Sequence, residues 1–261
     1  MTAAVAALLA GCGVVGGSPA AVRSHTTPSG ADVTAVAGLL AARDRLLVGR
    51  PTRPATVPDG DVLLERLREV PLASWTSSVR SVEASTPTSV TVRVRVTYRL
   101  DGDSRDVERD RLVTGQRTDG RWRLVADVPD GAARDLWDLG PVRVVSSARG
   151  VVVAAADVDP VIVTDAARTL GAAAAGVDAA WGSDWRRRSV VLVPADVDAA
   201  ARLLGRSSTA GLDQMAAFTV GVVATTPGTD RSGAERGVLL PGAVAALTPG
   251  GRRVVLAHEL T

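Results

Sequence analysis

Lysine and asparagine are absent from the 261 residues, so the 30 residues that carry a full positive charge are all arginine. Aromatic residues make up only 3% of the chain, and valine, leucine and alanine must therefore build its hydrophobic core. A single cysteine excludes an internal disulfide. The net charge of +2 is small and the longest arginine run is residues 186–188, a composition that gives little support to nucleic-acid binding.

What the chain does contain is typical of a soluble globular protein, with 46% hydrophobic and 22% charged residues. A length of 261 residues favours two domains over one. We expect a leader of residues 1–12, a flexible tether of residues 13–30, a first unit of residues 31–139 and a second unit of residues 140–261. Both units are expected to belong to the α+β class.

The expected leader ends at the only cysteine of the chain. An apolar stretch closes with Leu9-Ala10-Gly11-Cys12, which resembles a bacterial lipobox. The resemblance implies that a signal peptide is removed and that Cys12 carries a lipid, so that the protein is extracytoplasmic and anchored to the cell membrane. A signal peptide starts with positive charge, whereas the first arginine here is Arg23, so we expect the true start to lie upstream. The alternative is a free thiol in an Ala- and Gly-rich tail.

The tether of residues 13–30 is rich in Gly, Ser, Thr and Pro, which is typical of a flexible linker. His25 lies within it and has no second candidate ligand nearby in the sequence. We therefore interpret His25 as an exposed linker residue.

Two helices are predicted at the start of the first unit. Asp32 can cap a helix that ends near Val48, and a second helix should begin after Asp59 or Asp61. The apolar residues expected to face the core recur at helical spacing. They are Val33, Val36, Ala37, Leu40 and Leu47 in the first helix, and Val62, Leu63, Leu67 and Val70 in and after the second.

After residue 89 the period of the hydrophobic pattern changes to two. Apolar residues alternate with Thr and Arg over 90–100, and turn signals at 101–103 and 119–120 separate this strand from two more, over 105–118 and 122–128. In the last of these strands Trp122, Leu124, Ala126 and Val128 are expected to face inward. Helices followed by an antiparallel meander resemble cystatin-like or NTF2-like domains, and this resemblance implies that the first unit binds a ligand or partner.

The charged run of residues 101–111, DGDSRDVERDR, lacks the pattern of a calcium-binding loop. We interpret it as a hairpin with a solvated strand face. The first unit shows no grouping of His, Asp and Tyr that predicts catalysis.

The second unit is predicted to alternate strands and helices. Asp165 is interpreted as the cap of an Ala-rich helix over residues 160–181, and Asp196 as the cap of a short one over 199–204. Thr248 and Pro249 suit the start of a terminal helix that runs through His258. The expected strands span residues 142–145, 151–154, 189–193, 216–224 and 237–240.

The terminal helix carries the most specific motif of the chain. Its sequence ends in His258-Glu259-Leu260-Thr261, which matches the first four positions of H-E-x-x-H. In that motif two histidines one helical turn apart bind one zinc ion, and the glutamate is the general base. Apolar neighbours predict a largely buried helix, in which an ionisable pair needs a partner or a metal.

A sheet that precedes such a helix resembles the first part of a gluzincin, or peptidase-MA-like, zinc peptidase. The resemblance implies a peptide or protein substrate aligned on an edge strand, within residues 216–225 or 237–240. It makes His258 the first zinc ligand and Glu259 the catalytic base. The second histidine would follow Thr261, so we expect this chain to be the first part of a longer peptidase, with Zn²⁺ bound by the full-length protein and no activity in the chain alone.

Two other interpretations stay open. The chain can be a non-enzymatic envelope lipoprotein whose α+β domain binds a ligand or protein, with His258 and Glu259 on the solvent face of an amphipathic helix. It can also be an enzyme that uses acids at loop-to-helix junctions, although helix capping explains those acids more simply. The acids are Asp157, Asp159, Asp196 and Asp198.

Overall fold

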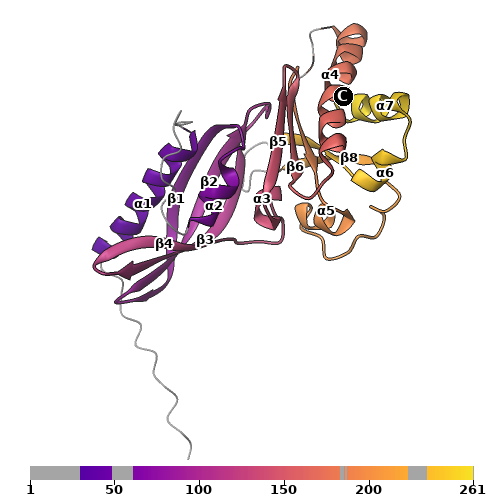
Figure 1. Cartoon of the computed structure of the whole chain (residues 1–261). Coiled ribbons are helices and arrows are strands. Elements are labelled where there is room, and N and C mark those ends of the chain that lie inside the picture. The colour runs from indigo at the N-terminus through magenta and orange to yellow at the C-terminus, as the bar shows by residue number, and fades with distance from the viewer. Residues whose placement is uncertain (1–29, 49–60, 183–184, 186, 223–233, 261) are drawn as a thin grey trace, which may run out of the picture.

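The computed structural model describes residues 30–48, 61–182, 185, 187–222 and 234–260 (Figure 1). Their helices and strands build two sheets, a four-stranded one in the order β1-β2-β3-β4 and a five-stranded one in the order β5-β6-β7-β9-β8. The predicted α+β class is confirmed.

The first unit is an antiparallel meander with a long helix, α1, packed across it. The alternation predicted for its second strand is confirmed, because every second residue from Val90 to Leu100 is fully buried. Its elements are α1 (Gly30–Val48), α2 (Val62–Leu67), β1 (Leu72–Thr86), β2 (Ser89–Leu100), β3 (Val107–Thr118), β4 (Arg121–Pro129) and α3 (Leu136–Leu139).

Helix α1 approaches the sheet closely at Gly115 of β3. A Cβ atom on this glycine would lie 2.5 Å from Cγ2 of Val36, closer than two carbon atoms can come without displacement. The glycine therefore lets the helix lie directly on the sheet. Leu40 and Leu47 continue the buried face of α1, as predicted.

A β-bulge reverses the inward face of β4. Thr114 pairs with Ala126 but Gly115 pairs with Leu124, so Val125 is an extra residue in β4. Trp122 and Leu124 face the core as predicted, whereas Asp127 takes the inward place beyond the bulge. The prediction that Val128 faces inward is wrong, since its side chain is 51% exposed. A bulge has this effect because one extra residue shifts the period-two alternation.

Two other predictions for the first unit need correction. Val62 lies in the first turn of α2 and is 54% exposed instead of buried. Strand β1 was not predicted, because most residues of its LASWTSSVRSVEAST sequence are polar and at least partly exposed. The N-cap assignment to Asp61 is confirmed, since its side chain accepts a hydrogen bond from the Leu64 amide.

The second unit is a mixed sheet with helices α4 and α7 on one face. Strands β6, β7 and β9 run parallel, while β5 and β8 pair antiparallel at its two edges. The predicted strands and long helices are all present. The elements are β5 (Val142–Ser147), β6 (Gly150–Ala155), α4 (Pro160–Trp181), β7 (Ser189–Val193), α5 (Val197–Leu203), β8 (Ala217–Val222), β9 (Ala234–Leu239), α6 (Pro241–Ala245) and α7 (Pro249–Leu260).

The N-cap of α4 is Asp159, whose side chain accepts a hydrogen bond of 2.8 Å from the Val161 amide. The prediction of Asp165 as the cap is therefore wrong. Asp165 lies inside the helix and pairs with Arg168 and Arg252 instead. Pro160 allows the earlier start, because the first helical position needs no amide hydrogen.

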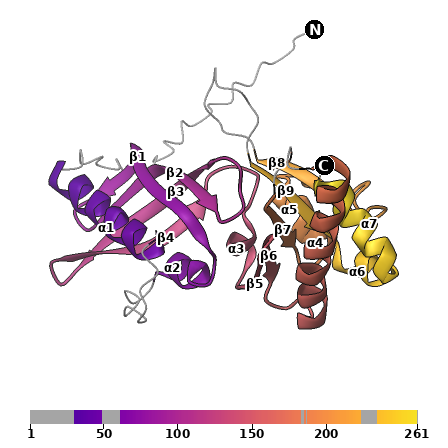
Figure 2. The ribbon, with the colours of Figure 1, turned by 90° about the horizontal axis from the view of Figure 1, so that it is seen from above.

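The two sheets share a hydrophobic core. Figures 1 and 2 show the first unit on one side of the five-stranded sheet and helices α4 and α7 on the other. One buried cluster joins Leu72, Tyr98 and Trp137 of the first unit to Val151, Val190 and Val238 of the second. The opposite face of the five-stranded sheet packs against α4 and α7 in a separate cluster. In the described part of the chain no helix is long and apolar enough to cross a membrane.

Candidate functional site

Helix α7 carries His258 and Glu259 and places Glu259 against the edge of the five-stranded sheet. Its start is fixed as predicted, since the Thr248 hydroxyl accepts a hydrogen bond of 3.1 Å from the Gly251 amide. Buried Leu256 and Leu260 attach the other end to the sheet and to α4.

The strand beside α7 is β8, at the edge of the sheet. Among the described residues β8 pairs only with β9, and no described strand lies on its outer side. Phe218 and Val220 face the first unit, whereas Thr219 and Gly221 are exposed on the side of α7. Of the two segments predicted to hold the edge strand, 216–225 contains β8 (Ala217–Val222), which is at the edge, whereas β9, which contains 237–239, is internal.

Glu259 is bound to this edge strand. The Thr219 hydroxyl donates a hydrogen bond of 2.6 Å to Oε2 of Glu259, and lies 3.3 Å from the backbone carbonyl oxygen of the same residue. On the neighbouring strand a Cβ atom at Gly237 would be 3.8 Å from Cβ of Glu259, so the glutamate lies directly over β9. His258, one position earlier, is exposed.

The residues at hand do not form a metal site by themselves. The described ranges contain no group of three or more His, Cys, Asp or Glu side chains that could hold a metal ion. A catalytic zinc ion needs about three protein ligands and a water. His258 supplies one candidate ligand, and the second histidine and the downstream glutamate that the gluzincin resemblance implies have no counterpart in the sequence.

The four aspartates considered as possible catalytic acids do not form a common site among the described contacts. Asp159 and Asp196 cap α4 and α5, the latter by accepting a hydrogen bond of 2.7 Å from the Ala199 amide. Asp157 and Asp198 are exposed. The capping interpretation is confirmed for Asp159 and Asp196.

Sequence reasoning missed a buried ionic cluster between the two units. Arg236 of β9 is 1% exposed and forms two hydrogen bonds with Asp103, of 3.0 and 2.7 Å, and one of 3.1 Å to the Tyr98 hydroxyl. Tyr98 in turn donates to Asp135 at 2.7 Å, and Arg109 lies 3.4 Å from that carboxylate. Burial raises the pKa of the Tyr98 hydroxyl well above its usual range, so the hydroxyl keeps its proton.

The interpretation of residues 101–111 as a solvated face is wrong for two of their side chains. Arg95 does pair with Glu108 and Asp110 on the outer face, as expected. Asp103 and Arg111, by contrast, have side chains that are 0% and 2% exposed. No local signal identifies them, because their partners lie in other elements of the fold, β9 for Asp103 and β4 and α3 for Arg111.

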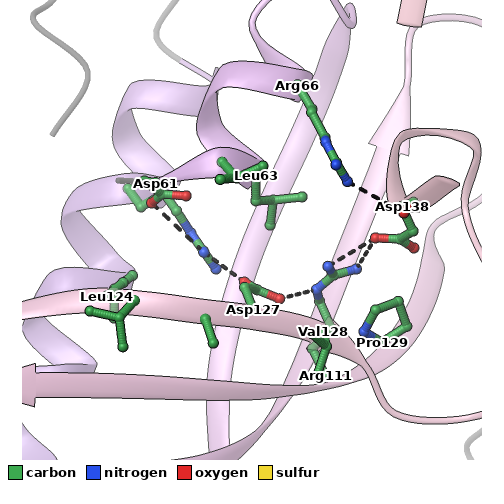
Figure 3. A pocket seen from close by; sticks show the side chains of 13 residues that line it. Asp61, Leu63, Arg66, Arg111, Leu124, Asp127, Val128, Pro129 and Asp138 are labelled. Atoms are coloured by element: carbon green, nitrogen blue, oxygen red, sulfur yellow. Dashed lines mark hydrogen bonds and ion pairs between the residues drawn. The ribbon is translucent and has the colours of Figure 1, made fainter. Parts of the chain in front are cut away.

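A pocket of about 270 Å³ opens between α2 and strands β3 and β4 (Figure 3). Three arginines and three aspartates alternate along it. Arg43 binds Asp127 at 2.6 Å, and Arg111 binds Asp127 and Asp138. Burial raises the pKa of Asp138, and the cation of Arg111 opposes this effect. The lining carries no net charge to attract an ion, since each of these carboxylates has a cation beside it.

A second pocket of about 320 Å³ lies between α1 and β4 and shares Arg43 and Asp61 with the first. Its lining is largely apolar and includes exposed arginines. The apolar residues are Leu39, Ala42, Leu46, Trp122 and Leu124, and the exposed arginines are Arg121 and Arg123.

Cys12 and His25 lie outside the described residues. Comparison of the chain with protein-family models, with curated proteins and with solved structures gives no match.

Proposed function

We propose that the chain is an extracytoplasmic lipoprotein, anchored through Cys12, whose second unit is the first part of a gluzincin-type zinc peptidase. In this proposal His258 is a zinc ligand and Glu259 is the general base. The remaining ligands would come from residues outside this sequence. The observation that carries the proposal is the hydrogen bond between Glu259 and Thr219 of the edge strand β8.

The hydrogen bond between Glu259 and the edge strand supports the proposal, because it keeps the carboxylate beside the strand on which a peptide would bind. An extended peptide can add to the outer side of β8 through backbone hydrogen bonds. Its scissile bond would then run past Thr219, the residue to which Glu259 is bound. The Thr219 hydroxyl occupies one oxygen of the carboxylate and leaves the other to accept a proton.

Zinc content tests the ligand assignment. The product of the complete reading frame that contains this chain should bind zinc, and His258→Ala should lower the metal load measured by mass spectrometry. His25→Ala is the matched control, because it removes the other histidine of this sequence, which has no place in the proposed site, and should leave the load unchanged. A full-length product without His258-dependent zinc would overturn the proposal.

Peptide cleavage by the same product tests the base. Glu259→Gln should retain zinc and lower kcat by about 10²- to 10⁴-fold, the usual contribution of a general base. Glu69→Gln changes an exposed glutamate near α2 and should leave kcat unchanged. Equal activity in the two variants would exclude Glu259 as the base.

Labelling of growing cells with a radioactive fatty acid tests the anchor. We expect label on the wild-type protein and none on Cys12→Ser, which should also leave the membrane fraction. Label that survives the substitution would contradict the lipobox assignment.

A second candidate function is favoured by the apolar pocket between α1 and β4. Trp122 and Leu124 in its lining and the exposed Arg121 and Arg123 beside them suit a ligand with an apolar body and an anionic end. Anilinonaphthalene sulfonate is such a probe. Its fluorescence should rise with the wild-type protein, and Ala42→Trp should abolish the rise by filling the pocket. Ala41→Trp, on the exposed side of α1, is the control that should bind normally.

A further inference from the structure

Arg236 connects the first unit to the strand that lies beneath Glu259. Its guanidinium holds the Asp103 carboxylate with two hydrogen bonds and the Tyr98 hydroxyl with a third. The Asp103 carboxylate also accepts a hydrogen bond of 2.8 Å from the Leu100 amide. Each partner of Arg236 thus belongs to β2 or to the turn after it, more than 130 residues earlier in the chain.

The opposite face of β9 meets the proposed site. Side chains alternate along a strand, so Arg236 points toward the first unit and the next residue, Gly237, faces α7. Gly237 pairs with Thr219 of β8, and its Cα is covered by Glu259. One peptide unit therefore separates Arg236 from Gly237, which lies beneath Glu259 and pairs with Thr219 across the sheet.

We propose that Arg236 is a positioning residue that lets the first unit fix β9, and through it the Thr219–Glu259 contact. The inference rests on the proposed function for its role in catalysis. The coupling between Arg236 and Thr219 is a property of the fold and can be tested without activity.

An arginine suits this position because its planar group matches a carboxylate with two parallel hydrogen bonds. A lysine would keep the charge but hold Asp103 as a point charge, without fixed orientation. Arg236→Lys should therefore loosen β9 while leaving the buried carboxylate with a cation. Arg111→Lys is the matched control, because Arg111 is equally buried, also holds its aspartates through several hydrogen bonds, and does so within the first unit.

The test measures two signals in this chain. The first is the γ-methyl resonance of Thr219 in a methyl-labelled sample, which should move in Arg236→Lys and stay in place in Arg111→Lys. The second is hydrogen exchange of backbone amides. Loss of one charge-assisted hydrogen bond should speed exchange in residues 217–222 and 234–239 by roughly tenfold in Arg236→Lys. The control should leave exchange in these strands at the wild-type rate.

Loss of global stability does not explain such a result, since both variants weaken a buried ionic contact. An unmoved Thr219 methyl and unchanged exchange in β8 and β9 of Arg236→Lys would overturn the inference. The same would follow if both variants moved the methyl equally. Failure of the zinc test leaves these signals untouched, so the proposed function and the positioning role can fail separately.

Discussion

The buried pair of Asp103 and Arg236 makes a strong prediction about stability. Its side chains are 0% and 1% exposed, so removal of one partner leaves a charge that water cannot reach. Arg236→Met should lower the free energy of unfolding by about 3–5 kcal/mol, because the Asp103 carboxylate loses its cation. Asp103→Asn should cost a similar amount for the opposite reason, although its amide oxygen can still accept from the Leu100 amide.

The double variant Asp103→Asn/Arg236→Met contains neither charge. It should be more stable than either single variant, because paired removal of a buried ion pair is often close to neutral. Tyr98 keeps its hydrogen bond to Asp135 in all three. We expect a coupling free energy of about 2 kcal/mol or more, a value typical of residues in direct contact.

Urea unfolding followed by tryptophan fluorescence measures these differences, since Trp75 stacks on Tyr98 and Trp137 packs edge-on against it in the shared core. Asp101→Asn is the control. Asp101 pairs with Arg188, but the two side chains are 49% and 42% exposed, so the loss should be about 0–1 kcal/mol. Additive single losses in the double variant would refute the view that the pair is a desolvated unit.

Two further predictions concern the first unit. Gly115→Ala should destabilise the fold by about 1–3 kcal/mol in urea unfolding, because the new methyl group meets Val36 of α1. Val36→Ala should recover part of that loss, and a neutral Gly115→Ala would contradict the close packing of α1. For Asp44, burial raises the pKa of the carboxyl above its ordinary value of 3.8, with the Ser77 hydrogen bonds opposing. The ionised carboxylate therefore destabilises the folded state at pH values above the raised pKa, and the effect is absent below about pH 3.8, where Asp44 is protonated in both states. The stability of the wild type relative to Asp44→Asn should fall as the pH rises from about 3.8 through the raised pKa, and a difference that rises over this window would contradict that sign.

The elements that follow from local patterns were predicted well. Strand β2 alternates strictly, and α1, α4 and α7 show helical spacing. The cap of α7 was predicted correctly, whereas the prediction of Asp32 as the cap of α1 is wrong, because the helix begins at Gly30 and Asp32 lies in its first turn. Strand β1 escaped prediction because much of it faces solvent on both sides. The bulge at Val125 could not be foreseen, since it depends on how β3 and β4 pair and leaves no mark in the β4 sequence itself.

In the candidate site, too, the residues identified by a local motif were predicted, and their distant partners were not. His258 and Glu259 were identified from a motif of adjacent residues, and their helix was predicted from its cap. The partner of Glu259 was not identified, because Thr219 lies 40 residues away and only the sheet order brings it close. The Asp103–Arg236 contact spans 133 residues, and nothing in a charged turn or in the AERGVL strand distinguishes a buried ion pair from two solvated charges.

The buried polar network between the pocket beside α2 and strand β9 is expected to act as a rigid support, since Asp138 at one end of the network lines that pocket. Asp138 accepts from the Asp135 amide, Asp135 accepts from Tyr98, and Tyr98 accepts from Arg236. The hydroxyl of Tyr98 has one proton, which it donates in the hydrogen bond to Asp135. The network therefore has no second arrangement that uses the same donors. Transmission between sites needs an element with two discrete states. The apolar pocket between α1 and β4 shares Arg43 with the pocket beside α2. Saturation of this apolar pocket with anilinonaphthalene sulfonate should therefore leave the Thr219 methyl resonance in place, and a shift as large as that caused by Arg236→Lys would show that the network is a relay.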